Sequence, residues 1–175
     1  MSNFSDLLGA QIKNEFEASQ QYAAVGVWFA RQDLPQLARY FYRQSLEERN
    51  HAMMMVQYMV DRDIAVEIPG VSPVRNDFSS ATEPIALALG QEKKVTADIR
   101  ALFAAARAEE DALGEQFMLW FLKEQVEEVA SMSTLLNVAE RAKENLFDLE
   151  NYVARESIGD GGQDTAAPQA AGGAL

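Results

Sequence analysis

Carboxylates and one imidazole interrupt the apolar stripes of four long segments of this sequence. In each segment apolar residues recur in steps of three and four, the spacing of a helix with one buried face. The polar residues on these stripes are Glu15, Glu48, His51, Glu92, Glu124 and Glu128. No lysine or arginine lies on the stripes to neutralise them, and burying an unpaired carboxylate is costly. The pattern therefore predicts a bound cation in the core.

The four segments place these residues at one depth. Glu15 and His51 are each about 18 residues from the predicted turn near Asp33, roughly 27 Å along a helix. Glu92 and Glu128 are each about 18 residues from the turn near Glu110, which gives the same length. Two helical hairpins would thus bring the acids into one layer.

The side chains available as metal ligands limit which ion the site can hold. The chain has no cysteine and one histidine, so a thiolate zinc site, an iron–sulfur cluster, a cysteine nucleophile and a His-rich site are all excluded. Glu48 and His51 are three residues apart and share one helix face. Carboxylate and imidazole donors suit octahedral iron or manganese, and a carboxylate that bridges suits two ions.

The elements that must hold this layer are all helical, because no segment shows the alternation of a strand. Sparse Pro and Gly predict helices over residues 5–31, 35–62, 82–108, 112–141 and 145–156. Ser5 and Thr82 are the expected N-caps. A loop at 63–81 is long enough to cross the bundle, so we expect one domain over 1–157 and a flexible tail over 158–175.

The charge balance restricts the partners. The net charge is −12, with 15 basic and 27 acidic residues, which argues against nucleic acid and anionic membranes as partners and favours cations. The longest apolar run, residues 22–30, is too short to span a membrane, and the first residues do not resemble a secretion signal. We therefore expect a soluble, cytoplasmic protein.

Specific motifs carry a family resemblance. Glu15 precedes Tyr22 by seven residues, a Glu-Glu-Arg-Asn-His run spans 47–51, and Trp120 precedes a Glu-Gln-Val-Glu-Glu run at 124–128. Over residues 5–156 the chain resembles the prokaryotic non-haem ferritins. The resemblance implies an all-α, ferritin-like four-helix bundle with a long crossover and a short fifth helix. It also implies oxidation of Fe(II) by dioxygen or peroxide and storage of ferric mineral in a hollow homo-oligomeric shell, commonly of 24 subunits.

The resemblance also implies roles for individual residues. The first iron of a di-iron centre would be held by Glu15, Glu48 and His51, and the second by Glu48 as a bridge, Glu92 and Glu128. Gln125 would lie beside the pair. A third iron site would use Glu47, Glu124 and Glu127. Tyr22 would supply an electron, although packing explains this residue almost as well.

Departures from neighbouring families leave alternatives open. Arg49 stands where bacterioferritins carry a haem-ligating methionine, so we expect no haem. A mini-ferritin that detoxifies iron and peroxide is one alternative. A non-catalytic helical interaction protein with protonated inner acids is another. The fifth helix carries an apolar stripe, Leu146, Leu149, Tyr152 and Val153, that we expect a second subunit to cover.

Overall fold

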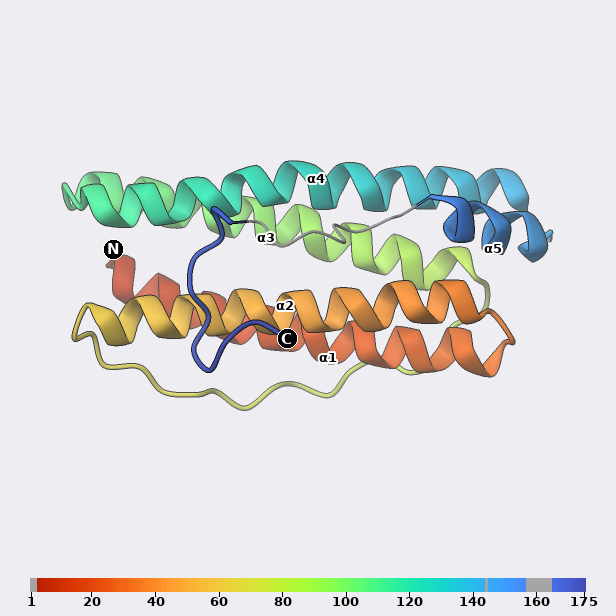
Figure 1. The fold of residues 1–175 in the computed structure, drawn as a ribbon, viewed down its shortest axis with the longest axis horizontal. Coiled ribbons are helices and arrows are strands. Elements are labelled where there is room, and N and C mark those ends of the chain that lie inside the picture. Colours follow the sequence, from red (N-terminus) through yellow and green to blue (C-terminus); the bar gives the residue numbers. More distant parts are fainter. Residues whose placement is uncertain (1–2, 144, 157–164) are drawn as a thin grey trace.

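The computed structural model describes residues 3–143, 145–156 and 165–175. It contains five helices: α1 (Phe4–Arg31), α2 (Pro35–Asp61), α3 (Thr82–Ala108), α4 (Ala112–Ala142) and α5 (Leu146–Arg155). The described residues contain no strand, which confirms the all-α prediction. The four long helices lie side by side along one axis, and α5 lies at one end (Figure 1).

Two antiparallel hairpins build the bundle. Asp33 and Glu110, both at positive φ, lie in the short turns that join α1 to α2 and α3 to α4. The crossover between α2 and α3 runs the length of the bundle (Figure 1). Gln21 ties it to α1, because its amide donates to the Arg75 carbonyl at 2.8 Å and accepts from the Arg75 N–H at 2.9 Å. The crossover therefore returns the chain to the end where α3 begins.

The helix starts differ from the prediction in their capping residues. Asn3, not Ser5, caps α1, and its side chain accepts from the Asp6 N–H at 2.8 Å. Thr82 is the first residue of α3, and the cap position is Ala81, which has no side-chain acceptor. The carboxylate of Glu83 reaches back to the N–H and hydroxyl of Ser79 instead. The carboxylate thus ties the start of α3 to the residues before it, and no side chain caps the first turn of the helix.

The core consists of two apolar clusters separated by a polar layer. One cluster lies toward the α1–α2 turn and includes Phe29, Phe41 and Leu135. The other lies toward the α3–α4 turn and includes Ile12 and Ile99. Every long helix passes from one cluster to the other, and the predicted ligands fall between them. Packing within the two apolar clusters fixes the positions of the helices relative to one another. The layer between the clusters contains polar side chains that are shielded from water.

The buried face of α4 is shifted from the predicted stripe. Met118, Gln125 and Met132 are buried. The predicted stripe instead included Glu124, which is half-buried. The buried face keeps the seven-residue repeat, because Met118, Gln125 and Met132 are each seven residues apart, but it lies one position later than predicted. Glu124 consequently lies at the edge of the layer, and Gln125 lies inside it.

The expectation that another subunit covers the apolar stripe of α5 is wrong for two of its four residues. Leu149 and Val153 are buried within the chain's own core. The Glu150 carboxylate docks the helix by accepting from the N–H groups of Gln36 and Leu37, at 2.9 and 2.8 Å. These donors belong to the first turn of α2, where a carboxylate is favoured.

The C-terminal residues differ from the flexible tail that we expected. Residues 158–164 of that tail lie outside the described part of the chain. Residues 165–175 run across α2 and end beside it (Figure 1). The Ala171 N–H donates to the Met53 carbonyl at 3.0 Å, and the Asn50 side chain exchanges two hydrogen bonds with the Leu175 backbone, at 3.3 and 3.1 Å. Small side chains such as the buried Ala170 let this backbone approach the helix.

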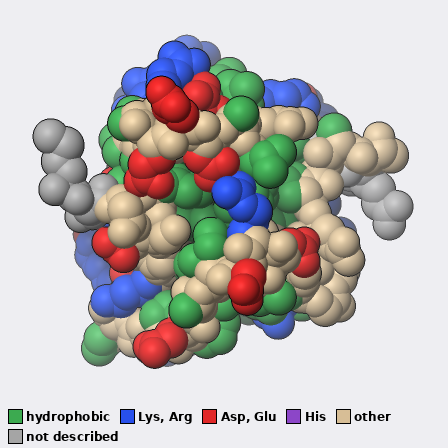
Figure 2. Space-filling model, turned by 90° about the vertical axis from the view of Figure 1, so that its left-hand side faces the viewer, with side chains coloured by type: hydrophobic (Ala, Val, Ile, Leu, Met, Phe, Trp, Pro, Cys, Tyr) green, Lys and Arg blue, Asp and Glu red, His purple; other side chains and the backbone are tan. Residues whose placement is uncertain are grey.

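Charged side chains are dispersed at the end of the bundle where α3 meets α4. Figure 2 shows acidic groups spread over this face, with basic groups between them. Arg62 contacts Asp111 here at 3.2 Å, which links the end of α2 to the α3–α4 turn. Among the described helices, none is both long and apolar enough to cross a membrane.

Candidate metal centre

An inner group of three buried side chains lies at the centre of the polar layer. Glu15 of α1 and Glu48 and His51 of α2 each offer one ligand atom, and these atoms lie within 4.8 Å of one another. His51 Nδ1 is 3.4 Å from Glu48 Oε2. Oε2 of Glu15 and both oxygens of Glu48 have no hydrogen-bond partner among the described residues. Unpartnered carboxylate oxygens beside an imidazole are a donor set that suits a divalent cation.

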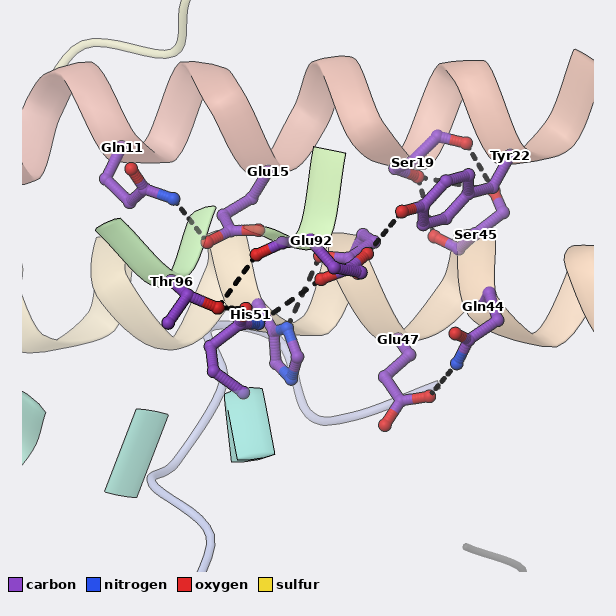
Figure 3. Close-up of polar contacts among 12 residues, drawn as sticks. Gln11, Glu15, Ser19, Tyr22, Gln44, Ser45, Glu47, His51, Glu92 and Thr96 are labelled. Carbon is purple, nitrogen blue, oxygen red and sulfur yellow. Dashed lines mark hydrogen bonds and ion pairs between the residues drawn. The ribbon is translucent and has the colours of Figure 1, made fainter. Parts of the chain in front are cut away.

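Glu92 of α3 lies beside this group with both oxygens engaged. The phenol of Tyr22 donates to Oε1, and the Gln125 amide donates to Oε2 at 3.3 Å. The Thr96 hydroxyl donates to the Gln125 carbonyl at 2.8 Å and so fixes the direction of that amide. Figure 3 shows Tyr22 and Glu92 directed toward each other. Gln125, which we expected beside the pair, thus positions Glu92.

Glu128 of α4 is buried in the same layer. Burial, and next the charges of Glu47 and Glu92, raise the pKa of Glu128 well above its usual value, and the Gln44 amide acts in the opposite direction. The charge of Glu128 in turn helps to raise the pKa of Glu48. Glu128 is therefore in the predicted layer, but it is not a member of the inner group of Glu15, Glu48 and His51.

A second, more open group forms an outer cluster of Glu47, His51 and Glu124. Their ligand atoms also lie within 4.8 Å of one another, and the two carboxylates are half-buried. Burial raises the pKa of Glu124, and the charge of His51 acts in the opposite direction. Glu127, which the resemblance placed in a third site, is exposed and is not a member of this cluster. His51 belongs to both groups.

The electrostatics of the layer favour a cation. Burial is the largest cause that raises the pKa of Glu48 and of Glu92, and for Glu48 the charges of Glu92 and Glu15 follow. Burial and the charge of Glu92 also raise the pKa of Tyr22 well above its usual value. A divalent cation would reverse these effects, because it neutralises the carboxylates where water cannot.

Aromatic rings hold the histidine. The rings of Trp120 and Phe121 pack edge-on against His51, with centroids 5.7 and 5.6 Å away. Trp120 is thus a packing partner of the imidazole, which restricts the directions in which its two nitrogens can point.

Several supporting residues were missed by the sequence reasoning. Gln11 donates to Glu15 Oε1 at 2.8 Å, and Asn14 donates to the Gln11 carbonyl at 3.1 Å. Thr96 was also missed. Gln44 falls on the apolar stripe of α2, and this signal could have identified it. Gln11 and Asn14 also had a signal in the sequence, because Gln11 lies four residues before Glu15 and Asn14 lies three residues after Gln11, which are the spacings of neighbours on one helix face.

The fold and the site together define a helical bundle with a buried carboxylate–histidine group that could hold a metal ion. A family profile for the ferritin-like domain matches residues 5–142. The chain belongs to the ferritin family.

Known proteins agree with this assignment. The chain is 59% identical over 174 residues to a protein named ferritin BfrB from Mycolicibacterium smegmatis, covering 99% of this chain and 96% of that protein. It is 34% identical over 139 residues to a bacterial non-heme ferritin from Staphylococcus aureus, covering 79% and 84%. An open-pore ferritin structure from Archaeoglobus fulgidus superposes with a TM-score of 0.83 at 24% identity, covering 87% and 95%. This last similarity concerns the fold alone.

Proposed function

We propose that this protein is an iron-storage ferritin that oxidises Fe(II) at the inner group and stores the ferric product. The observation that carries the proposal is the set of oxygens on Glu15 and Glu48 that have no hydrogen-bond partner among the described residues and lie beside His51. The names of the relatives, ferritin BfrB and non-heme ferritin, support the same function.

The substrate would be two Fe(II) ions. Glu15, Glu48 and His51 would bind the first, and Glu48, Glu92 and Glu128 would bind the second, with Glu48 as the bridge. Carboxylates favour the ferric state because they offset its extra positive charge. Each iron gives up one electron, so a pair reduces dioxygen to hydrogen peroxide with two protons, or reduces hydrogen peroxide to water.

Tyr22 has the contact that an electron donor needs. Its buried phenol donates a hydrogen bond to Glu92. Loss of an electron makes a phenol strongly acidic, and Glu92 is placed to accept the proton at the same time. The same bond also gives Tyr22 a structural role, since it holds one oxygen of Glu92.

The outer cluster and the assembly complete the proposal. Glu47 and Glu124, with Glu127 nearby on α4, would receive iron on its way to or from the inner group. Subunits would form a closed shell, commonly of 24 copies in this family, in the cytoplasm. We propose that the protein works without haem, because Arg49 occupies the position of the haem-ligating methionine.

Oxidation kinetics test this function. Fe(II) is added without oxygen, air is admitted, and near-ultraviolet absorbance follows the ferric product. We expect fast growth for the wild type. For Glu48→Ala we expect the rate of iron in buffer, because this substitution removes the proposed bridging ligand.

Glu140→Ala is the matched control, since Glu140 is an exposed glutamate on the same bundle. It should oxidise iron like the wild type. A wild type that is no faster than buffer would instead favour the non-catalytic interaction protein. Light-scattering mass measured on the same samples determines whether a shell forms.

A further inference from the structure

A chain of hydrogen bonds runs from the surface of the bundle to the inner group. At its outer end, on α3, the Lys94 ammonium lies 3.0 Å from Asp98 Oδ2. The same oxygen accepts from the side-chain amide of Asn14 on α1 at 3.3 Å. This amide also donates to the Gln11 carbonyl at 3.1 Å, and the Gln11 amide donates to Glu15 Oε1 at 2.8 Å. The chain thus connects an ion pair at the surface to a buried carboxylate of the centre.

Exposure to water falls along this chain toward the centre. The Asp98 side chain is 36% exposed, and Asn14 is half-buried. Gln11 and Glu15 are each 1% exposed. A hydrogen bond to a charged group is strong, and it is stronger still where water is excluded. The bond between Gln11 and Glu15 is therefore the one that water can least replace.

The carboxylate at the outer end allows only one direction for these bonds. An ionised carboxylate can only accept hydrogen bonds, whereas an amide has donors at one end and an acceptor at the other. Asp98 therefore turns the N–H groups of Asn14 toward itself, and one of them reaches the Gln11 carbonyl. Because the Gln11 carbonyl is engaged there, the N–H groups of this residue face Glu15.

The direction of the chain decides which oxygen of Glu15 remains available to a cation. Figure 3 shows the Gln11 amide directed at Glu15. Oε1 of Glu15 accepts from this amide, and Oε2 has no hydrogen-bond partner among the described residues. If the Gln11 amide were reversed, two acceptors would face each other without a hydrogen between them, and Glu15 would lose its holder.

We propose that Asn14 and Asp98 are positioning residues for the first cation: acting through Gln11, they hold Glu15 so that its Oε2 stays available to the inner group. The proposal rests on the proposed function, because it concerns how the first Fe(II) is bound. It extends the centre beyond its ligands, to a carboxylate at the surface of α3. Neither Asn14 nor Asp98 touches the cation, since each acts through its neighbour in the chain.

An anaerobic Co(II) titration of the assembled protein, followed by visible absorbance near pH 8, measures binding of the first cation. Asn14→Asp keeps the size of the side chain and replaces its donor by an acceptor, so the Gln11 amide must turn its N–H groups away from Glu15. We expect the first Co(II) to bind about tenfold more weakly than in the wild type, because a ligand loses its supporting partner. Asp98→Ala should weaken it about threefold, because Asn14 keeps its bond to Gln11 but loses the acceptor that fixes its direction.

A double variant separates positioning from packing of α1 against α3. Asn14→Asp combined with Asp98→Asn restores an amide–carboxylate pair between the two helices and the charge of that pair, but it leaves Gln11 reversed. A chain that only joins the helices predicts wild-type affinity for the double variant, whereas we expect binding to stay about tenfold weaker. Asp61→Ala is the matched control, since Asp61 accepts from the Gln57 amide on the exposed side of α2. It should bind Co(II) like the wild type.

Crystals soaked in Zn(II) show the same effect directly. In the wild type we expect Glu15 to bind the ion through Oε2 with the Gln11 bond intact, and in Asn14→Asp we expect a reversed Gln11 amide. Wild-type affinity in Asn14→Asp or Asp98→Ala, or recovery in the double variant, overturns the proposal. Asp98→Ala, at the exposed end of the chain, decides the matter if Asn14→Asp does not fold. Absence of Fe(II) oxidation by the wild type is a different result, because it contradicts the proposed function, whereas the Co(II) affinities of the variants measure positioning.

Discussion

At the scale of single residues, the centre combines groups that elsewhere would destabilise a core. Both oxygens of Glu48 are buried without a hydrogen-bond partner in the described part of the chain, and burial and the charges of Glu92 and Glu15 raise its pKa. A core of this kind is tolerable when a carboxylate takes up a proton or when a cation replaces the proton. Stability of the metal-free protein must therefore depend on pH.

The pH dependence has a definite sign. The pKa values of Glu48, Glu92 and Glu128 are raised above 4.5 in the folded chain. Their contribution to stability is fully present below the unfolded value and is lost as the pH rises through the folded values. We expect the melting temperature of the metal-free wild type to fall relative to that of Glu48→Gln as the pH is raised from about 4.5 to 8. Each pH unit between the two pKa values of one group is worth about 1.4 kcal/mol.

Thermal unfolding of both proteins across this range, with chelator present, measures the difference. Adding Mn(II) at the upper pH should raise the melting temperature of the wild type more than that of Glu48→Gln. If the melting temperatures of the two proteins changed with pH in parallel, ionisation of Glu48 in the folded protein would cost no stability. That result would contradict the electrostatic description of the layer.

At the scale of elements, side-chain amides join segments that are distant in the sequence. Gln21 holds the crossover by pairing with both backbone groups of Arg75, and Asn50 pairs in the same way with Leu175. A side-chain amide presents an N–H donor and a carbonyl acceptor at about the spacing of a peptide group. It can therefore pair with the backbone of an extended segment as a neighbouring strand would. In this way an extended segment can attach to a helix.

Asn50→Ala should release residues 165–175 from α2. It removes two hydrogen bonds at the end of the segment, so hydrogen exchange at the amides of Ala171 and Leu175 should accelerate about tenfold. Mass-spectrometric exchange on the assembled protein measures this effect. Gln57→Ala is the control, because this amide also lies on α2 but contacts Asp61. Equal exchange in Asn50→Ala and the wild type would show that packing of Ala170 suffices to hold the segment.

At the scale of the whole molecule, several large apolar side chains of the described residues stay exposed, among them Ile68 and Val126. The most exposed of them is Phe147 of α5, whose side chain is 83% exposed although its helix neighbours Leu149 and Val153 are buried. A fully exposed phenylalanine beside a docked helix is typical of a contact between subunits. The proposed shell gives this residue a partner.

Phe147→Asp should therefore reduce the assembly mass without unfolding the subunit. The substitution places a charge in the proposed contact, where burial without a partner costs several kcal/mol. Light scattering measures the mass, and circular dichroism confirms that the helices remain. A variant of wild-type mass would place the contacts between subunits elsewhere on the chain.

The sequence by itself determined the helical class, the order of the helices, the crossover and the depth at which the acids meet. Apolar spacing and chain length fix these properties, because a helix has a constant rise and a constant repeat. It also indicated that Glu15, Glu48 and His51 belong together. The structure brings these three residues to within ligand distance of one another.

Only the tertiary structure decided how the layer is divided. Glu47 lies with Gln44, Glu92 lies with Tyr22 and Gln125, and residues 165–175 return to α2. These pairings depend on the rotation of each helix about its own axis and on side-chain directions. A linear pattern leaves both undetermined, because several rotations bury the same apolar stripe, whereas each brings different polar neighbours into contact.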